Sequence, residues 1–202
     1  MATGMEIQGG KQKMNIENAR EKLQEGKIGL YPTETAYGVA ADALNKEAVE
    51  EVYKAKQRPK SKPLTTICYN LEQVEKHSNL TDDERKLVDE FMPGPLTLVV
   101  EKKSHVPDNL NESFVFRIPG SETARELAKE GAITATSANI SGENTSYRIG
   151  DISEELLNKV DFVVDEGELS DGPTSTIAEV NNGEVEIHRR GPVSKEDLRK
   201  VV

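Results

Sequence analysis

The stretch KIGLYPTETAYGVAADALNKEAVEEVYKAKQRP, residues 27–59, contains the signals of both kinds of secondary structure. Residues 27–31 form a short apolar run that ends at a proline, which predicts a strand. Asn45 is a good helix cap, and the apolar residues after it recur on one helical face until Pro59 forces an end. A strand followed by a helix predicts a fold in which helices cover a sheet.

The same alternation continues along the chain. The sequence Asn181-Asn-Gly183 lies between two strand-like runs, which is typical of an antiparallel hairpin. Alternating elements with one hairpin predict an α/β domain with a mixed sheet over residues 15–202. Strands are predicted over 63–68, 96–100, 113–118, 132–136, 161–164, 175–180 and 184–189, and helices over 16–25, 45–57, 81–91, 121–131, 151–159 and from 194. Residues 1–14, with two adjacent glycines and three methionines, are expected to be a flexible leader or an expression remnant.

Composition limits the classes of function. Lys and Arg number 26 and Asp and Glu number 36, giving a formal net charge of −10, which argues against broad binding to nucleic acid or anionic lipid. The single cysteine, Cys68, excludes an internal disulfide and a zinc site built from several cysteines. It also fits a reducing compartment, so we expect a cytoplasmic protein. No apolar run reaches the roughly 18 residues that a membrane helix needs.

The common catalytic signatures are absent from the sequence. It has no phosphate-binding Gly-x-x-x-x-Gly-Lys loop, no Gly-x-Gly-x-x-Gly and no Gly-x-Ser-x-Gly elbow. His77, His105 and His188 are scattered in polar segments, and we expect them at the surface. Cys68 lies in an apolar run, which favours a buried, inert thiol.

Polar groups lie at five places, at the ends of predicted strands and at the end of one helix, with few carboxylates among them. Each group alone fits ordinary turn or helix-end chemistry. Strand ends in α/β sheets are also where ligands bind. Taken together, the groups predict an anionic ligand held by hydrogen bonds and charge, with no protein nucleophile. They lie in residues 31–38, in the basic run 54–62, at Arg117, in residues 136–142, and in residues 173–176 together with Arg189 and Arg190.

These segments, in this order, resemble the YrdC-like family of L-threonylcarbamoyl-AMP synthases, and most closely its single-domain archaeal members. The resemblance implies a twisted mixed sheet with flanking helices around a large concave cavity. It also implies the reaction of L-threonine, bicarbonate and ATP to threonylcarbamoyl-AMP and pyrophosphate. The motifs that carry it are residues 31–38, Lys56-Gln-Arg58, Pro93-Gly-Pro95 with Thr97, Arg117-Ile-Pro119, Ser137-Ala-Asn139 with Ser141-Gly142, Ser175-Thr-Ile177 and Arg190-Gly191.

The resemblance also implies roles for individual residues. Those expected to be catalytic are Lys56, Arg58, Ser137 and Asn139. Those expected at ATP are Lys56, Arg58, Lys62, Ser113, Asn139, Ser146, Arg148 and Arg190. Those expected at threonine are Thr33, Thr35, Arg117, Ser137 and Ser175.

Magnesium is expected to arrive with ATP, bridged by phosphates, with no protein side chain as ligand. Two positions depart from the family pattern: Ile67 stands where many members have histidine, and Thr136 where proline is common. Residues 142–150 and 54–62 are the candidates for a lid that excludes water.

Partners and alternatives also follow from the resemblance. The product is expected to pass to a threonylcarbamoyl-transferase complex that modifies tRNA beside the anticodon. A second hypothesis is a module that binds tRNA or double-stranded RNA directly through the basic run 54–62. A third is a related carbamoyl-adenylate-forming enzyme, and a fourth an inactive paralogue, against which the intact Lys56-x-Arg58 and Ser137-x-Asn139 pairs argue. No membrane partner is expected.

Overall fold

The computed structural model describes residues 6–7 and 11–202, and its main feature is a nine-stranded mixed sheet. Three neighbouring pairs are parallel (β10 with β6, β5 with β7, and β3 with β9), and the other pairs are antiparallel. The sheet confirms the predicted α/β fold. In spatial order it runs β11 (Glu184–Arg189), β10 (Thr176–Asn181), β6 (Leu96–Val100), β7 (Phe114–Arg117), β5 (Thr65–Ile67), β8 (Ile133–Ser137), β4 (Tyr37–Ala40), β3 (Gly29–Pro32) and β9 (Phe162–Val163).

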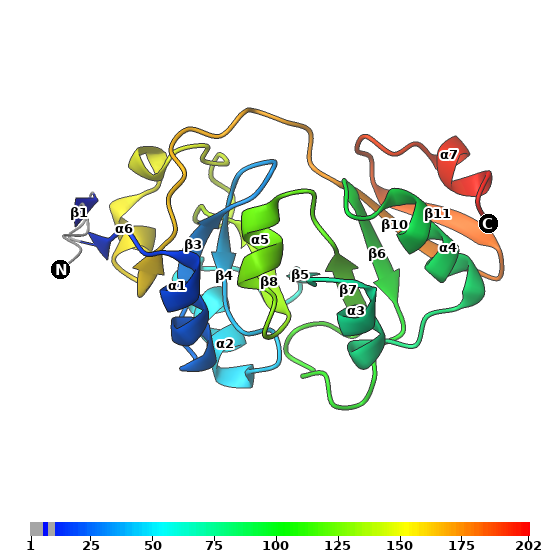
Figure 1. The fold of residues 1–202 in the computed structure, drawn as a ribbon, viewed down its shortest axis with the longest axis horizontal. Helices are drawn as coiled ribbons and strands as arrows, with labels where there is room; N and C mark the ends of the chain where they lie inside the picture. Colours follow the sequence, from blue (N-terminus) through cyan, green and yellow to red (C-terminus); the bar gives the residue numbers. More distant parts are fainter. Residues whose placement is uncertain (1–5, 8–10) are drawn as a thin grey trace.

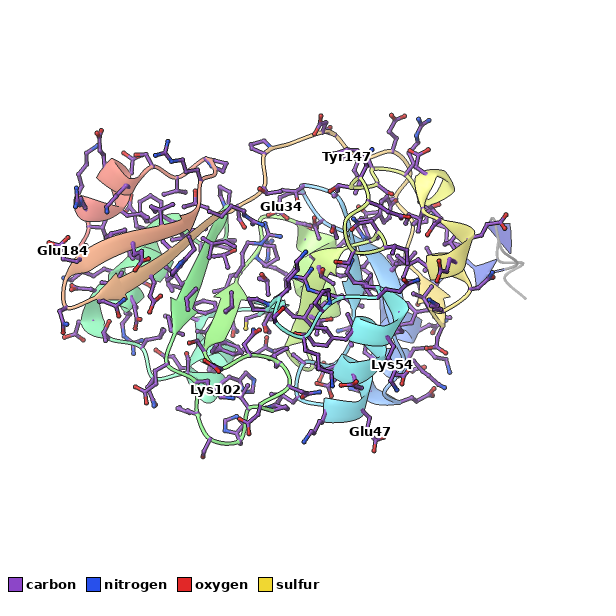
Figure 2. All side chains as sticks on the ribbon, turned by 180° about the vertical axis from the view of Figure 1, so that it is seen from behind. Glu34, Glu47, Lys54, Lys102, Tyr147 and Glu184 are labelled. Atoms are coloured by element: carbon purple, nitrogen blue, oxygen red, sulfur yellow. The ribbon has the colours of Figure 1, made fainter. Side chains whose placement is uncertain are left out.

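Helices flank the sheet on both faces. Figures 1 and 2 show α1 and α5 on one face and α2 on the other, and Figure 1 places α1 and the C-terminal helix α7 at opposite ends of the molecule. The predicted caps are formed: the Asn15, Asn45 and Ser121 side chains accept backbone N–H groups, and Thr81 with Glu84 makes a capping box. The helices are α1 (Ile16–Gln24), α2 (Lys46–Ala55), α3 (Leu71–His77), α4 (Asp82–Phe91), α5 (Glu122–Leu127), α6 (Glu154–Leu157) and α7 (Lys195–Arg199), with a 3-10 turn at Ile149–Asp151.

Burial on both faces explains why β7 shows no alternation of buried and exposed residues. All four residues of β7 are buried, although residues 113–118 predict an alternating strand with one apolar face. Phe114 and Phe116 stack with ring centroids 5.7 Å apart in the larger apolar cluster. Cys68 is fully buried, as predicted, and burial raises the pKa of its thiol.

Several elements differ from those the sequence predicts. Residues 31–38 form a hairpin of β3 and β4 rather than a strand followed by a turn. The strand β4 is inconspicuous in the sequence because it contains Gly38 and Ala40, which favour strands weakly. A Cβ at Gly38 would lie 3.0 Å from the Tyr31 ring, so the small residue lets the aromatic ring pack across the hairpin.

Two further differences concern helices. The sequence pattern does not predict helix α3. The helix predicted over 151–159 is replaced by the 3-10 turn followed by one turn of α-helix. The hairpin at the other end is confirmed, with Asn182 at φ 52° and Gly183 at φ 78° between β10 and β11.

The first residues meet the edge of the sheet. Strands β1 (Glu6–Ile7) and β2 (Lys11–Gln12) pair with each other, and the Met14 N–H donates to the Val163 carbonyl at 2.8 Å. Residues 1–5 and 8–10 lie outside the described residues, so the flexible leader over 1–14 stays a prediction. Within the described residues, no helix has the length and apolar character to span a bilayer.

His77 is a correction to the expectation of three surface histidines. It is buried, its Nδ1 lies 3.0 Å from Nε2 of His105, and its ring packs against Phe114 with centroids 5.9 Å apart. Burial, together with the positive charges of His105, Lys76 and Lys103, lowers the pKa of His77 to about 4. His188 is exposed, as expected.

We expect this histidine to make the fold sensitive to acid. Between the usual pKa of about 6.5 and the folded value near 4, the unfolded chain binds a proton that the folded chain does not, so stability falls as the pH falls through this window. His77→Gln should therefore reduce the acid-induced loss by about 2 kcal/mol, measured as the difference in urea unfolding free energy between pH 7 and pH 4.5. The exposed control His188→Gln should leave that difference unchanged; equal losses in all three proteins would contradict the assignment.

Candidate functional site

A polar cavity of about 300 Å³ opens where several strand ends meet. Its walls come from the β3–β4 turn, from the ends of β5, β7 and β8, and from the start of β10. The segment 164–175 crosses the molecule from β9 to β10 and brings Thr174 and Ser175 to the same place (Figure 1). The lining residues are Tyr31, Thr33, Thr35, Ala36, Tyr37, Gly38, Arg58, Pro63, Thr65, Arg117, Ala135, Thr136, Ser137, Thr145, Thr174, Ser175 and Arg189.

Three arginines dominate the charge of the cavity lining, which contains no Asp, Glu, His or Cys among the described residues. Burial lowers the pKa of Arg58 and of Arg189, and the charge of Arg117 adds to the effect at Arg189. Guanidinium groups stay charged despite such shifts. The cavity is therefore suited to carboxylate or phosphate and has no side chain that would act as a nucleophile other than hydroxyls.

Lys56 lies behind the cavity wall rather than in it. Its side chain is 1% exposed, and its Nζ donates to the Ser137 carbonyl, to the Asn139 carbonyl at 2.6 Å and to Asn139 Oδ1 at 3.4 Å. Burial, followed by the nearby charge of Arg58, lowers the pKa of Lys56 to about 7. The ammonium thus ties the end of α2 to the loop after β8.

Hydroxyl groups in the cavity are held by one another and by the backbone. Ser137 Oγ donates to Asn139 Oδ1, and Thr33 Oγ1 lies 3.0 Å from Thr35 Oγ1. On the opposite wall, the Ser175 hydroxyl lies 2.8 Å from Thr97 Oγ1 and accepts from Arg189 at 3.0 Å. These contacts fix hydroxyls on two sides of one polar space, as the recognition of a small polar ligand requires.

Known proteins are similar to this chain in sequence and in fold. The sequence model of the family Sua5/YciO/YrdC, described as "Telomere recombination", matches residues 21–191. This chain belongs to the Sua5/YciO/YrdC family. A protein of Methanocaldococcus jannaschii is 34% identical over 196 residues, covering 96% of this chain and 94% of the relative. The threonylcarbamoyl-AMP synthase of Pyrococcus abyssi is 33% identical over 186 residues, covering 89% of this chain and 55% of that protein.

Solved structures of the Sua5/YciO/YrdC family agree with the fold. The crystal structure of P. abyssi Sua5 complexed with L-threonine superposes with a TM-score of 0.84 at 32% identity, covering 95% of this chain and 59% of that one. The chain therefore spans little more than half of this longer relative and nearly all of the M. jannaschii protein.

The cavity brings together six of the residues that the sequence assigns to the family's site. Lys56 and Asn139 lie directly behind it, joined to Ser137. The six that line the cavity are Thr33, Thr35, Arg58, Arg117, Ser137 and Ser175. The departures from the family pattern also lie here: Thr136 lines the cavity, whereas Ile67 is buried in an apolar cluster.

Five other residues assigned to ATP do not line the cavity. Lys62 is exposed beside it, and Ser113 is half-buried just before β7. Arg148 is exposed and pairs with Asp151 at 3.3 Å, and the Ser146 hydroxyl donates to the Asp151 carbonyl at 3.3 Å. The fifth, Arg190, does not line the cavity, whereas its neighbour Arg189 does; both arginines are exposed. Their contacts with ATP stay predictions.

Arg189 is a site residue that the family assignment leaves out. The register of β11 shifts at its end: Ile187 pairs with Ala178, but Arg189 pairs with Ile177, so regular alternation does not place the Arg189 side chain. Its guanidinium donates to the Ser175 carbonyl at 2.9 Å and to the Ser175 hydroxyl at 3.0 Å, which holds it at the cavity. Other lining residues that the family assignment leaves out include Tyr31, Thr65 and Thr145.

Gly191 shows why the motif Arg190-Gly191 needs glycine. A Cβ at this position would lie 2.4 Å from the Thr176 nitrogen, 2.5 Å from the Thr174 carbonyl oxygen and 2.6 Å from the Ser175 carbonyl carbon. All three are backbone atoms, which cannot rotate away. The absence of a side chain thus allows the end of β11 to pass closely over the segment that carries Ser175.

Replacing the buried ammonium should loosen the loop after β8. We expect Lys56→Met to speed hydrogen exchange of the amides in residues 138–143 by about tenfold or more, because a charge-assisted hydrogen bond contributes roughly 1.5–3 kcal/mol. Mass spectrometry of deuterated peptides measures this. The control is Lys54→Met on the same helix, whose side chain is exposed and pairs with Glu51 (Figure 2). Unchanged hydrogen exchange in Lys56→Met, or an equal increase in the control, would contradict the role of Lys56 in holding this loop.

Proposed function

We propose that this chain is an L-threonylcarbamoyladenylate synthase, which converts L-threonine, bicarbonate and ATP to threonylcarbamoyl-AMP and pyrophosphate. The observation that carries the proposal is a cavity with three guanidinium groups and fixed hydroxyls, whose lining, over the part of the chain that the structure describes, holds no thiol, imidazole or carboxylate. The similarity of the chain to P. abyssi Sua5, whose crystal structure was determined with L-threonine, supports the choice of amino acid.

The chemistry needs placement more than a reactive side chain. The amine of threonine and bicarbonate give a carbamate and water, and a carbamate oxygen then attacks the α-phosphorus of ATP, from which pyrophosphate leaves. Neither step forms a bond to the protein. The rate gain comes from holding two anions side by side and stabilising charge on phosphate.

In this proposal the two walls of the cavity have different tasks. Arg117 binds the threonine carboxylate, and the hydroxyls of Thr33, Thr35, Ser137 and Ser175 hold its polar groups. Arg58 and Arg189 face the phosphates, with Asn139 held in position by Lys56. The loop 142–150 contributes Thr145 to the lining and is positioned to exclude water, which would hydrolyse the mixed anhydride.

Magnesium fits this site as a companion of ATP. The lining offers hydroxyls and carbonyls but no carboxylate or imidazole among the described residues, so phosphate oxygens and water would supply the ligands. When bound, the ion would neutralise phosphate charge. The cluster of Glu179, Glu186 and His188 lies on the β10–β11 hairpin and is not part of the lining.

Two exposed cations of the basic run, Lys54 and Lys60, weigh against the hypothesis of an RNA-binding module. Lys54 pairs with Glu51 at 2.7 Å and Lys60 with Glu50 at 2.9 Å, so their charges are locally balanced. A surface for phosphate backbones needs uncompensated cations. We therefore propose a cytoplasmic enzyme whose product passes to a threonylcarbamoyl-transferase complex acting on tRNA, with RNA contacted through that complex.

The activity predicts a strict substrate requirement. Purified protein should release pyrophosphate from ATP only when L-threonine and bicarbonate are both present, measured with a coupled pyrophosphatase and phosphate assay. Arg58→Ala should lower the rate at least tenfold, because a guanidinium stabilises charge that develops on phosphate. The control Arg85→Ala removes an exposed arginine paired with Glu75 on distant helices and should leave the rate unchanged. Release without threonine, or none with all substrates, would rule out the proposal.

A further inference from the structure

The strongest unexplained contact at the cavity is an ion pair between Arg117 and Glu34. Arg117 NH1 lies 2.9 Å from Glu34 Oε1, and the two side chains are 7% and 29% exposed. Glu34 comes from the turn between β3 and β4, whereas Arg117 is the last residue of β7. The contact therefore joins the β3–β4 turn to an arginine that lines the cavity, and Figure 2 places Glu34 where the hairpin meets the other half of the sheet.

This carboxylate stands where a ligand's carboxylate would bind. Arg117 faces the cavity, and a nearly buried guanidinium requires a negative partner. Among the described residues, Glu34 is its sole ion-pair partner. An amino acid binds a buried arginine through the same group, a carboxylate, so Glu34 and the ligand compete for one site.

The surroundings of Glu34 allow it to leave. Besides Arg117, its carboxylate accepts a hydrogen bond only from the Gly120 N–H, at a long 3.4 Å, among the described contacts. Its two neighbours in the turn are fixed differently: Thr33 Oγ1 donates to the Ala36 carbonyl at 2.7 Å and lies close to Thr35 Oγ1. The turn can thus keep its shape while the Glu34 side chain rotates towards solvent.

We propose that Glu34 is an internal competitor that occupies Arg117 in the free protein and is displaced by the carboxylate of the amino-acid substrate. This proposal rests on the function proposed above. Glu34 keeps Arg117 neutralised and oriented before substrate arrives, and it admits a ligand only if that ligand carries its own carboxylate. Phosphate anions do not bind at Arg117, because Glu34 already balances its positive charge. Arg58 and Arg189 have no carboxylate within ion-pair distance among the described residues, so they are free to bind phosphate.

The cost of displacement sets the expected effect. If the internal pair is formed most of the time, the apparent affinity is the intrinsic affinity multiplied by the small fraction of molecules in which Arg117 is free. Removing the competitor should then tighten binding by about three- to tenfold. A residue that only stabilises the turn, or one that contacts the substrate amine, would give weaker binding when replaced.

The test is isothermal titration of L-threonine into the full chain and its variants. Glu34→Gln, which keeps the shape of the side chain, should bind about three- to tenfold more tightly than the wild type. Glu34→Asp keeps the negative charge but shortens its reach to Arg117, so it should bind more tightly than the wild type and more weakly than Glu34→Gln. Glu75→Gln is the matched control, because Glu75 pairs with Arg85 at the surface of α3, and it should bind as the wild type does.

The outcomes separate this proposal from the function on which it rests. Equal or weaker binding by Glu34→Gln would overturn the proposed competition. Binding by Glu34→Asp identical to that of the wild type would also overturn it, because a negative charge near the cavity would then explain the affinity without an ion pair to Arg117. Thermal unfolding of each variant shows whether the fold is retained. If neither the wild type nor any variant binds L-threonine, the proposed function fails, whatever the role of Glu34.

Discussion

The buried ammonium of Lys56 is the contact on which the site depends. It joins the last turn of α2 to the loop after β8, two segments that are 80 residues apart in sequence, through the Ser137 carbonyl and both oxygen atoms of Asn139. Ser137 then faces the cavity and Arg58, two residues after Lys56, reaches it from the other side. One buried charge therefore determines where a hydroxyl and a guanidinium of the site stand relative to each other, and backbone carbonyls replace the water that the charge has lost.

The distribution of charge matters more than its total. The chain carries a formal net charge of −10, which by itself argues against anionic ligands. The structure concentrates three arginines on one cavity and places acidic residues in first turns of helices and in surface pairs. An acidic exterior around a basic cavity disfavours a long nucleic acid across the surface. It remains compatible with a small anion that enters the cavity, because the local field there is set by the nearest charges.

Local signals in the sequence predict most of the fold. Caps, prolines and the Asn-Gly turn mark where the backbone changes direction, and they placed α1, α2, α4 and the β10–β11 hairpin closely. Strand β4 is not predicted because Gly38 favours strands weakly; the residue is small to make room for the Tyr31 ring, a contact across the hairpin that the order of residues does not reveal. His77 was misplaced for the same reason: its burial depends on His105 and Phe114, which are distant in sequence.

The candidate site, like the fold, is predicted only in part by local signals in the sequence. Motifs at strand ends identified the residue types that meet in the cavity, since strand ends converge whatever the order of the strands. They could not distinguish Arg189 from Arg190, because the register between β10 and β11 shifts beside Ile177, and this shift decides where the Arg189 side chain lies. Nor could they reveal that Glu34, an ordinary turn residue in the sequence, lies 2.9 Å from Arg117. A residue's type indicates what it can bind; its partner across the fold determines whether that capacity is already in use.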